Sequence, residues 1–255
     1  KNFCFVMISN YILFVICVSI CLKLTDCKLF LKQDFENFPH VLGCSECATT
    51  LHGRTTEKKA TIETEATSGN KYLFSKSNAY QQYSAARIKP VLFNGTDFSM
   101  SLWLNMQELS RYSEYPRIVA NYIYTPRSSD PTRTNVNTGC HIYLSSRTRW
   151  AYSKAGTFAF YGRYSDVDGK TVTHSLGAYS NLVFPNRWVH LVVTFNSSES
   201  TVRLYYDTHQ VAKSSHRGKR LLLHQQSGFT LGGYVNGPIN NMTGWNGYES
   251  RGVFC

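Results

Sequence analysis

The basic segment Lys213–Arg220, KSSHRGKR, is the densest group of side chains that could carry chemistry. Its candidate residues are Lys213, His216, Arg217, Lys219 and Arg220. Clustered cations attract polyanions, and the forked guanidinium of Arg binds carboxylate or sulfate oxygens in pairs. We predict an anion- or glycan-binding site here. Two alternatives stay open, namely a dibasic processing site ending at Arg220 and a solvated loop between strands. A second arginine group, in predicted middle loops, consists of Arg127, Arg133, Arg147 and Arg149.

Acidic residues could hold a metal ion or cleave a glycosidic bond. In YSDVDGKT, Asp166 and Asp168 precede a glycine, as at the start of a calcium loop, because calcium prefers several hard oxygen ligands. The same stretch joins two apparent strands, so a hairpin turn is the favoured interpretation and a calcium site is the alternative. The nearest acid pair for hydrolysis is Glu63 and Glu65, which lies outside the predicted core. We expect no cofactor, with calcium as the alternative, and no catalysis, with a glycoside hydrolase as the alternative.

The compartment is predicted from an apolar leader and from glycosylation motifs. Residues 3–22 are almost uncharged, which is typical of a secretory signal peptide over residues 1–22, with an uncleaved membrane anchor as the alternative. Three Asn-x-Ser/Thr motifs in predicted turns begin at Asn94, Asn196 and Asn241. The net charge of +11 then favours a glycan, a sulfated polysaccharide or another extracellular protein as partner, and not nucleic acid. If the leader is cleaved, no stable membrane span remains.

Five cysteines follow the leader, and an oxidising compartment would favour disulfide bonds among them. They are Cys27, Cys44, Cys47, Cys140 and Cys255. Because five is odd, one is unpaired, intermolecular, or paired beyond Cys255. The pair Cys44 and Cys47 has the spacing of a redox dithiol or half a zinc site, but no second ligand pair appears, so structural disulfides are the simpler interpretation.

Alternating side chains indicate an all-β fold. Arg187–Asp207 predicts an antiparallel hairpin, because two alternating runs flank the turn residues NSSES, and His190 is expected to be structural. Residues 23–70 are poorly patterned, and we expect an irregular segment there. From residue 71 onward further strands are predicted at Lys71–Ser75, Phe98–Gln107, Arg117–Thr125, Cys140–Ser146, Thr157–Ser165, Lys170–Leu176 and Ser227–Tyr234. This spacing favours a two-sheet sandwich or jelly roll over alternating strands and helices.

Four blocks in order resemble the concanavalin A-like jelly roll, specifically its laminin G-like or pentraxin-like branch. They are DFSMSLWLNM (97–106), RWVHLVVTFNSSESTVRLYYD (187–207), FTLGG (229–233) and WNGYESRGVF (245–254). Two departures are Asp207-Thr208, where the family often has Asp-Gly, and the ending after Gly252, which a truncation at the C-terminus would explain. The resemblance implies a laminin G-like domain over residues 71–255. It also implies a secreted, non-catalytic binding or adhesion module that recognises a glycan, matrix or cell-surface partner through rim loops. The alternative is the non-catalytic domain of a larger extracellular enzyme.

Overall fold

A computed structural model describes part of the unit Leu31–Cys255. The described residues are 48–53, 60–64, 66–75, 84–89, 96–108, 117–124, 139–145, 156–184, 186–223, 228–232, 235–236 and 251–254. They form strands and turns and contain no helix. In these ranges, therefore, no helix has the length and apolarity needed to cross a membrane.

One sheet has seven strands and is called the smaller sheet. Its order is β12 (His209–Ser215), β11 (Thr201–Tyr206), β10 (Trp188–Asn196), β5 (Phe98–Glu108), β16 (Arg251–Phe254), β3 (Lys71–Ser75) and β2 (Thr61–Thr64). Every pairing is antiparallel. The predicted hairpin is confirmed, since β10 and β11 pair from Leu191 with Tyr206 to Asn196 with Thr201.

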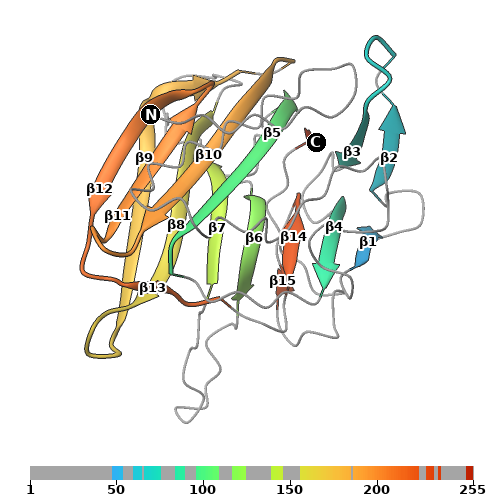
Figure 1. The fold of residues 1–255 in the computed structure, drawn as a ribbon. Helices are drawn as coiled ribbons and strands as arrows, with labels where there is room; N and C mark the ends of the chain where they lie inside the picture. Colours follow the sequence, from blue (N-terminus) through green and yellow to red (C-terminus); the bar gives the residue numbers. More distant parts are fainter. Residues whose placement is uncertain are drawn as a thin grey trace, which may run out of the picture. The chain divides into compact units, whose positions relative to one another are not determined.

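The other sheet has nine strands and is called the larger sheet. Its order is β1 (Ala48–Gly53), β4 (Ser84–Lys89), β14 (Phe229–Leu231), β6 (Arg117–Tyr124), β7 (Gly139–Ser145), β8 (Gly156–Ser165) and β13 (Arg220–Leu221). In addition, β9 (Thr171–Val183) pairs with β8, and β15 (Val235–Asn236) runs parallel to β6. In Figure 1, strands β10 and β5 cross over the strands of the larger sheet.

The two sheets enclose a single apolar core, because each strand turns alternate side chains inward. Val189, Leu191 and Val193 of β10 are fully buried. Rings from the two sheets meet across the core, with Tyr164 of the larger sheet 4.9 Å from Phe195 of the smaller sheet between ring centroids. Burying one such side chain contributes about 1.5–3 kcal/mol. The expected two-sheet antiparallel sandwich is confirmed.

Parts of the segment 23–70 that the structure describes differ from the expectation of an irregular chain. Residues 48–53 and 61–64 form β1 and β2, which pair with β4 of the larger sheet and β3 of the smaller sheet respectively. These strands are rich in Thr and carry few large apolar side chains, so their alternation is weak in the sequence. Pairing with a neighbouring strand supplies the backbone hydrogen bonds that define them.

The departure at Asp207-Thr208 forms a two-residue turn between β11 and β12. Both residues have positive φ, 44° for Asp207 and 76° for Thr208. Such a turn matches the twist of a hairpin and normally takes Asn or Gly. Threonine pays a steric penalty in this region because its Cβ is branched. The turn nevertheless forms, because Tyr206 pairs with His209 on either side of it.

Candidate functional site

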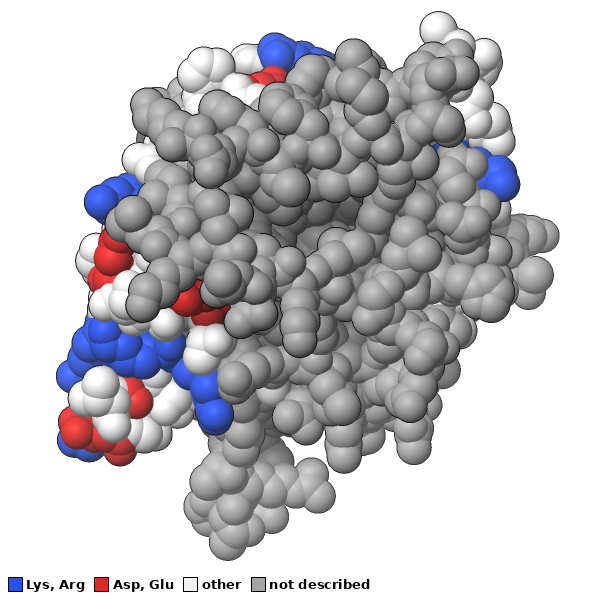
Figure 2. All heavy atoms as spheres, viewed as in Figure 1, with Lys and Arg blue, Asp and Glu red and all other residues white. Residues whose placement is uncertain are grey.

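The five residues of the predicted basic site do not lie together. They are divided between the outer face of the smaller sheet, the outer face of the larger sheet and the edge of the sandwich. Lys213 of β12 is exposed and pairs with Arg203, which pairs in turn with Thr194. This row lies on the outer face of the smaller sheet. Arg220 of β13 is also exposed, but it pairs with Ser165 on the outer face of the larger sheet. Figure 2 shows cations and acids side by side near the turn between β8 and β9.

Two of the five predicted residues are half-buried and bond other parts of the chain. The Lys219 Nζ donates to the carbonyl oxygens of Ser197 and Ser198, at 3.1 and 3.3 Å, and so holds the turn between β10 and β11. The His216 Nδ1 accepts the backbone N–H of Gly218 at 2.9 Å. A Cβ at Gly218 would collide with Tyr164 and the His216 ring, so this loop is packed tightly against the sandwich edge.

His216 belongs to a ring cluster at that edge. Its ring centroid lies 4.2 Å from Tyr164, 4.5 Å from His174 and 5.6 Å from Phe195. Three buried polar atoms of the cluster have no hydrogen-bond partner, namely Tyr164 Oη, His174 Nε2 and His216 Nε2. Burial lowers the pKa of His216 to about 4, with further lowering by His174 and Lys219. His216 thus packs among the rings of the sandwich edge, and its Nδ1 is engaged by the Gly218 N–H.

Asp166 and Asp168 form the turn between β8 and β9. Asp166 Oδ1 accepts the backbone N–H groups of Asp168 at 3.0 Å and Lys170 at 2.8 Å. Its Oδ2 lies 3.7 Å from the Nε of Arg217, whose side chain is 72% exposed. This geometry is a hairpin turn, the interpretation that the sequence favoured. Within the ranges that the structure covers, no three His, Cys, Asp or Glu side chains gather as a metal site would require.

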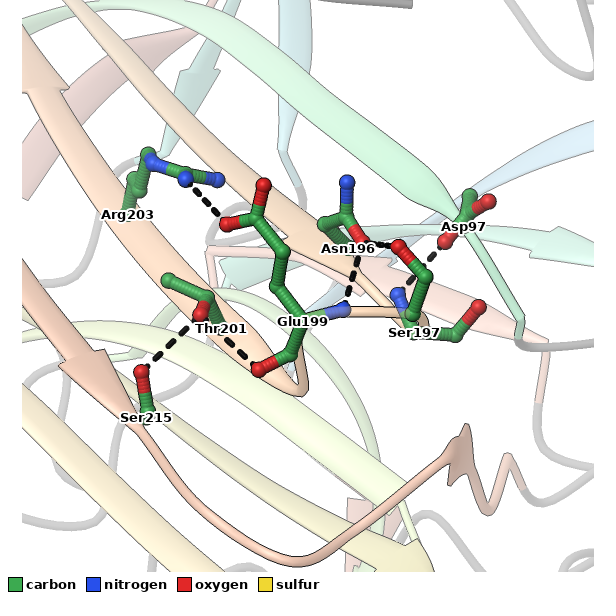
Figure 3. Close-up of polar contacts among 8 residues, drawn as sticks. Asp97, Asn196, Ser197, Glu199, Thr201, Arg203 and Ser215 are labelled. Carbon is green, nitrogen blue, oxygen red and sulfur yellow. Dashed lines mark hydrogen bonds and ion pairs between the residues drawn. The ribbon is translucent and has the colours of Figure 1, made fainter.

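The Asn196 motif lies in the turn between β10 and β11 (Figure 3). The Asn196 Oδ1 accepts the Ser198 hydroxyl at 2.7 Å and the Glu199 N–H at 2.9 Å. In Figure 3 the amide nitrogen of Asn196 points away from these bonds. Asp97, just before β5, accepts the Ser197 N–H at 2.6 Å and fixes the turn from the other side.

Several predicted residues lie outside the described residues. These are residues 1–22, Asn94, Asn241, Cys27, Cys44, Cys47, Cys255, Glu65, Arg127, Arg133, Arg147 and Arg149. Cys140 of β7 is a free thiol in the core, and burial raises its pKa to about 12. It is one candidate for the unpaired cysteine. Glu63 accepts hydrogen bonds from Thr61 at 2.9 Å and Tyr72 at 3.5 Å on β2 and β3, as a structural residue would.

The outer face of the larger sheet holds a group that the sequence did not reveal. We call it the basic aromatic face, and it consists of His141, Tyr143, Tyr161, Arg163, Thr173, Ser175 and Arg220. Pairing sets these residues side by side, since His141 pairs with Tyr161 and Tyr161 with Ser175. Arg163, two residues along β8, pairs with Thr173. Aromatic residues therefore occupy one end of this face and cations the other.

Side-chain contacts order the aromatic end. The His141 and Tyr161 rings stack, with centroids 4.8 Å apart and planes 14° apart. The Tyr143 hydroxyl reaches across β8 to within 3.3 Å of the Ser175 hydroxyl on β9. The Arg163 Nε donates to the Tyr161 hydroxyl at 3.2 Å. Burial lowers the pKa of His141 well below 6.5, and Arg117 lowers it further, so His141 stays a neutral stacking partner.

A sequence signal for this face existed in TFAFYGRYS. Strand β8 alternates between two kinds of side chain. Its buried side carries Phe158, Phe160 and Tyr164, and its outer side carries Tyr161, Arg163 and Ser165. That alternation identifies the outer residues of β8. It does not identify their neighbours on β7, β9 and β13, because strand pairing brings these from distant parts of the chain.

Solved structures with a similar arrangement share low identity with the chain. The CBM40 of the Ruminococcus gnavus IT-sialidase, bound to α2,3-sialyllactose, is 11% identical with a TM-score of 0.43, over 63% of this chain and 73% of that chain. The CBM66 carbohydrate-binding module of Bacillus subtilis is 10% identical with a TM-score of 0.34, over 81% and 91%. A heptameric SAP-like pentraxin of Limulus polyphemus is 10% identical with a TM-score of 0.37, over 63% of each chain.

Sequence comparison assigns the family. No curated protein matches the chain. A laminin G family model, described as concanavalin A-like lectin/glucanases superfamily, matches residues 77–248. This span runs from before β4 to beyond β15 and so includes strands of both sheets, but not β1, β2, β3 or β16. The chain belongs to the concanavalin A-like lectin/glucanases superfamily.

Proposed function

We propose that this protein is a non-catalytic, extracellular glycan-binding module that binds through the basic aromatic face. The main support for this proposal is the order of the aromatic end, where Tyr161 stacks on His141 and the Tyr143 hydroxyl approaches the Ser175 hydroxyl. Aromatic rings offer large, rigid apolar contact area together with a polar tip. Hydroxyl groups on the neighbouring strand can exchange hydrogen bonds with sugar hydroxyls. Membership in a superfamily of lectins and glucanases supports this choice of ligand.

Catalysis has weaker support than binding. Glycoside hydrolysis needs two carboxyl groups about 5–10 Å apart across the scissile bond. None of the described outer-face residues of β7, β8, β9 and β13 is acidic. The extracellular location rests on the apolar leader and the three glycosylation motifs, and expression through a eukaryotic secretory pathway would test it by a glycosidase-sensitive loss of mass.

Glycan binding is tested by screening the full chain on a glycan array and measuring affinity for each hit by calorimetry. Tyr161→Ala should weaken binding by about tenfold or more, because the ring supplies apolar contact and positions Arg163. The matched control is Trp103→Ala, which removes a 38%-exposed ring from the outer face of the smaller sheet. Equal losses in both variants would contradict the assignment to the basic aromatic face.

Non-catalytic behaviour needs its own readout. The chain is incubated with every glycan that it binds, and the release of reducing ends is followed over time. We expect no release above the rate without protein. Time-dependent release that survives purification to homogeneity would contradict the proposal and favour the hydrolase alternative.

A further inference from the structure

The cationic end of the basic aromatic face indicates which charge its ligand carries. The inference drawn from it rests on the glycan-binding function proposed above. Arg220 is exposed and pairs with Ser165 of β8, while Arg163 lies two residues before Ser165 on the same face. Diagonal neighbours of this kind have Cα atoms about 7–8 Å apart. Two guanidinium groups thus lie within reach of one sugar unit or of two successive units.

Backbone hydrogen bonds fix the strand that carries Arg220. Lys219 N–H donates to the Ser165 carbonyl at 2.7 Å, and Leu222 N–H donates to the Arg163 carbonyl at 2.7 Å. The Lys219 side chain adds a third tether through its bond to the Ser197 carbonyl. Arg220 therefore projects from a held strand next to β8, whereas a loop residue would lose more conformational freedom on binding.

Carboxylates elsewhere do not neutralise this pair. The Asp166 carboxylate at the end of β8 is occupied by two backbone N–H groups, and Arg217 approaches it. Neither Arg163 nor Arg220 forms an ion pair with an acidic residue in the described parts of the chain. Arg163 is positioned by Tyr161 through its Nε alone, so its terminal nitrogens can form the paired bonds that carboxylate and sulfate accept.

On the smaller sheet side, comparable arginines pair with carboxylates. Arg203 binds Glu199 at 2.5 Å, and Arg187 binds Asp207 at 2.9 Å. Among the described residues, the same residue type is therefore ion-paired on one side and available on the other.

We propose that the basic aromatic face selects acidic glycans, with Arg163 and Arg220 binding carboxylate or sulfate groups while the tyrosine rings contact the sugar rings. Charge-assisted hydrogen bonds to a fork of this kind are about twice as strong as neutral ones. A neutral glycan would leave both guanidinium groups without a counter-charge from the ligand.

The test compares matched acidic and neutral polymers, namely hyaluronan with its carboxyl-reduced form and dextran sulfate with dextran. Affinities of the full chain are measured by biolayer interferometry at one salt concentration. We expect at least one acidic polymer to bind about tenfold more tightly than its neutral partner. The first pair reports carboxylate recognition and the second reports sulfate recognition.

Variants then locate the selectivity. Arg163→Gln combined with Arg220→Gln should reduce the preference for the acidic polymer to less than about twofold, while its thermal melt shows that it is folded. The control is a double variant, Lys213→Gln with Arg217→Gln. It removes the same number of positive charges at positions outside the basic aromatic face, and it should preserve the preference. A loss of the same size in this control would show a net-charge effect and overturn the proposal.

The two proposals fail differently. Equal binding of acidic and neutral polymers, weakened in both cases by Tyr161→Ala, would overturn charge selection and leave glycan binding intact. Binding that Tyr161→Ala does not change, or no binding to any glycan on the array or to these polymers, would overturn glycan binding itself.

Discussion

On the outer face of the smaller sheet, Trp103 stacks on His190 with centroids 4.9 Å apart, and His190 shares a 2.7 Å hydrogen bond with Ser101. On the outer face of the larger sheet, His141 stacks on Tyr161 in the same cross-strand manner. Each face thus carries a histidine stacked on an aromatic ring of the neighbouring strand. Their cations differ, because Arg203 and Arg187 pair with carboxylates, whereas Arg163 contacts a tyrosine hydroxyl and Arg220 projects outward. Pairing, and not composition, separates a structural arginine from an available one.

The largest expected effect breaks the internal pairing near the smaller sheet. Asp207 accepts the His190 N–H at 2.8 Å through Oδ1 and binds Arg187 through Oδ2. Asp207→Ala leaves a backbone donor of β10 without this acceptor, and we expect a loss of about 2 kcal/mol in the free energy of unfolding. Urea unfolding measures the loss.

The matched control is Asp207→Asn, which keeps an acceptor for His190 and removes the charge facing Arg187. It should cost less than about 1 kcal/mol, because exposed ion pairs contribute little. Glycan affinity should stay unchanged in both variants. If Asp207→Ala is folded but binds glycans more weakly, the smaller sheet takes part in binding, and the assignment to the basic aromatic face is contradicted.

A pH series tests the sandwich edge that joins the two faces. The folded pKa of His216 is about 4, below the ordinary value of 6.5, because burial, His174 and Lys219 oppose its charge. As pH falls below 6.5 the unfolded chain binds a proton that the folded chain does not, so the stability contributed by neutral His216 is lost between pH 6.5 and about 4. Burial lowers the pKa of His174 as well, which adds a loss of the same sign.

Thermal melts from pH 7 down to pH 4 measure this loss as a falling Tm. His216→Asn keeps an acceptor for the Gly218 N–H and removes the titrating ring. Its Tm should fall less steeply over the same pH range. A parallel fall in the wild type and the variant would mean that other groups dominate the acid sensitivity.

Lys219→Met tests whether this lysine is structural. Its Nζ holds two carbonyl oxygens of the turn between β10 and β11, so we expect a loss of about 1 kcal/mol. Because the Nζ bonds this turn and not the basic aromatic face, affinity for acidic glycans should change by less than about twofold. A larger loss of glycan affinity, with the free energy of unfolding unchanged, would show that Lys219 takes part in ligand binding.

The smallest expected effect is a gain. Thr208→Gly removes a branched Cβ from a residue with φ of 76°, and we expect the free energy of unfolding to rise by about 0.5–1 kcal/mol. The gain is partly offset by the greater freedom of glycine in the unfolded chain. A shift of Tm by a few degrees would report it, and a lower Tm would show that the Thr208 side chain makes a favourable contact.

Parts of the fold were predictable because they depend on local alternation. The hairpin of β10 and β11 follows from the alternation of residues such as Val189 and Leu191 and from the turn chemistry between the strands. Strand β4 was missed, because SAARIK has small side chains and a buried arginine, Arg87, at 4% exposure. The apolar side chains of β4 are too small to give a clear alternating pattern, and the strand is defined by its pairing with β1 and β14.

The candidate site shows the same division. The sequence by itself determined the alternation of β8, and with it that Tyr161 and Arg163 share the face opposite Phe158 and Phe160, because side-chain direction repeats every two residues. Only the tertiary structure decided that Arg220 joins this face while Lys213 does not, and that Lys219 and His216 bond other parts of the chain. Neighbours across strands are set by pairing between distant segments, and the spacing of residues along a chain does not encode it.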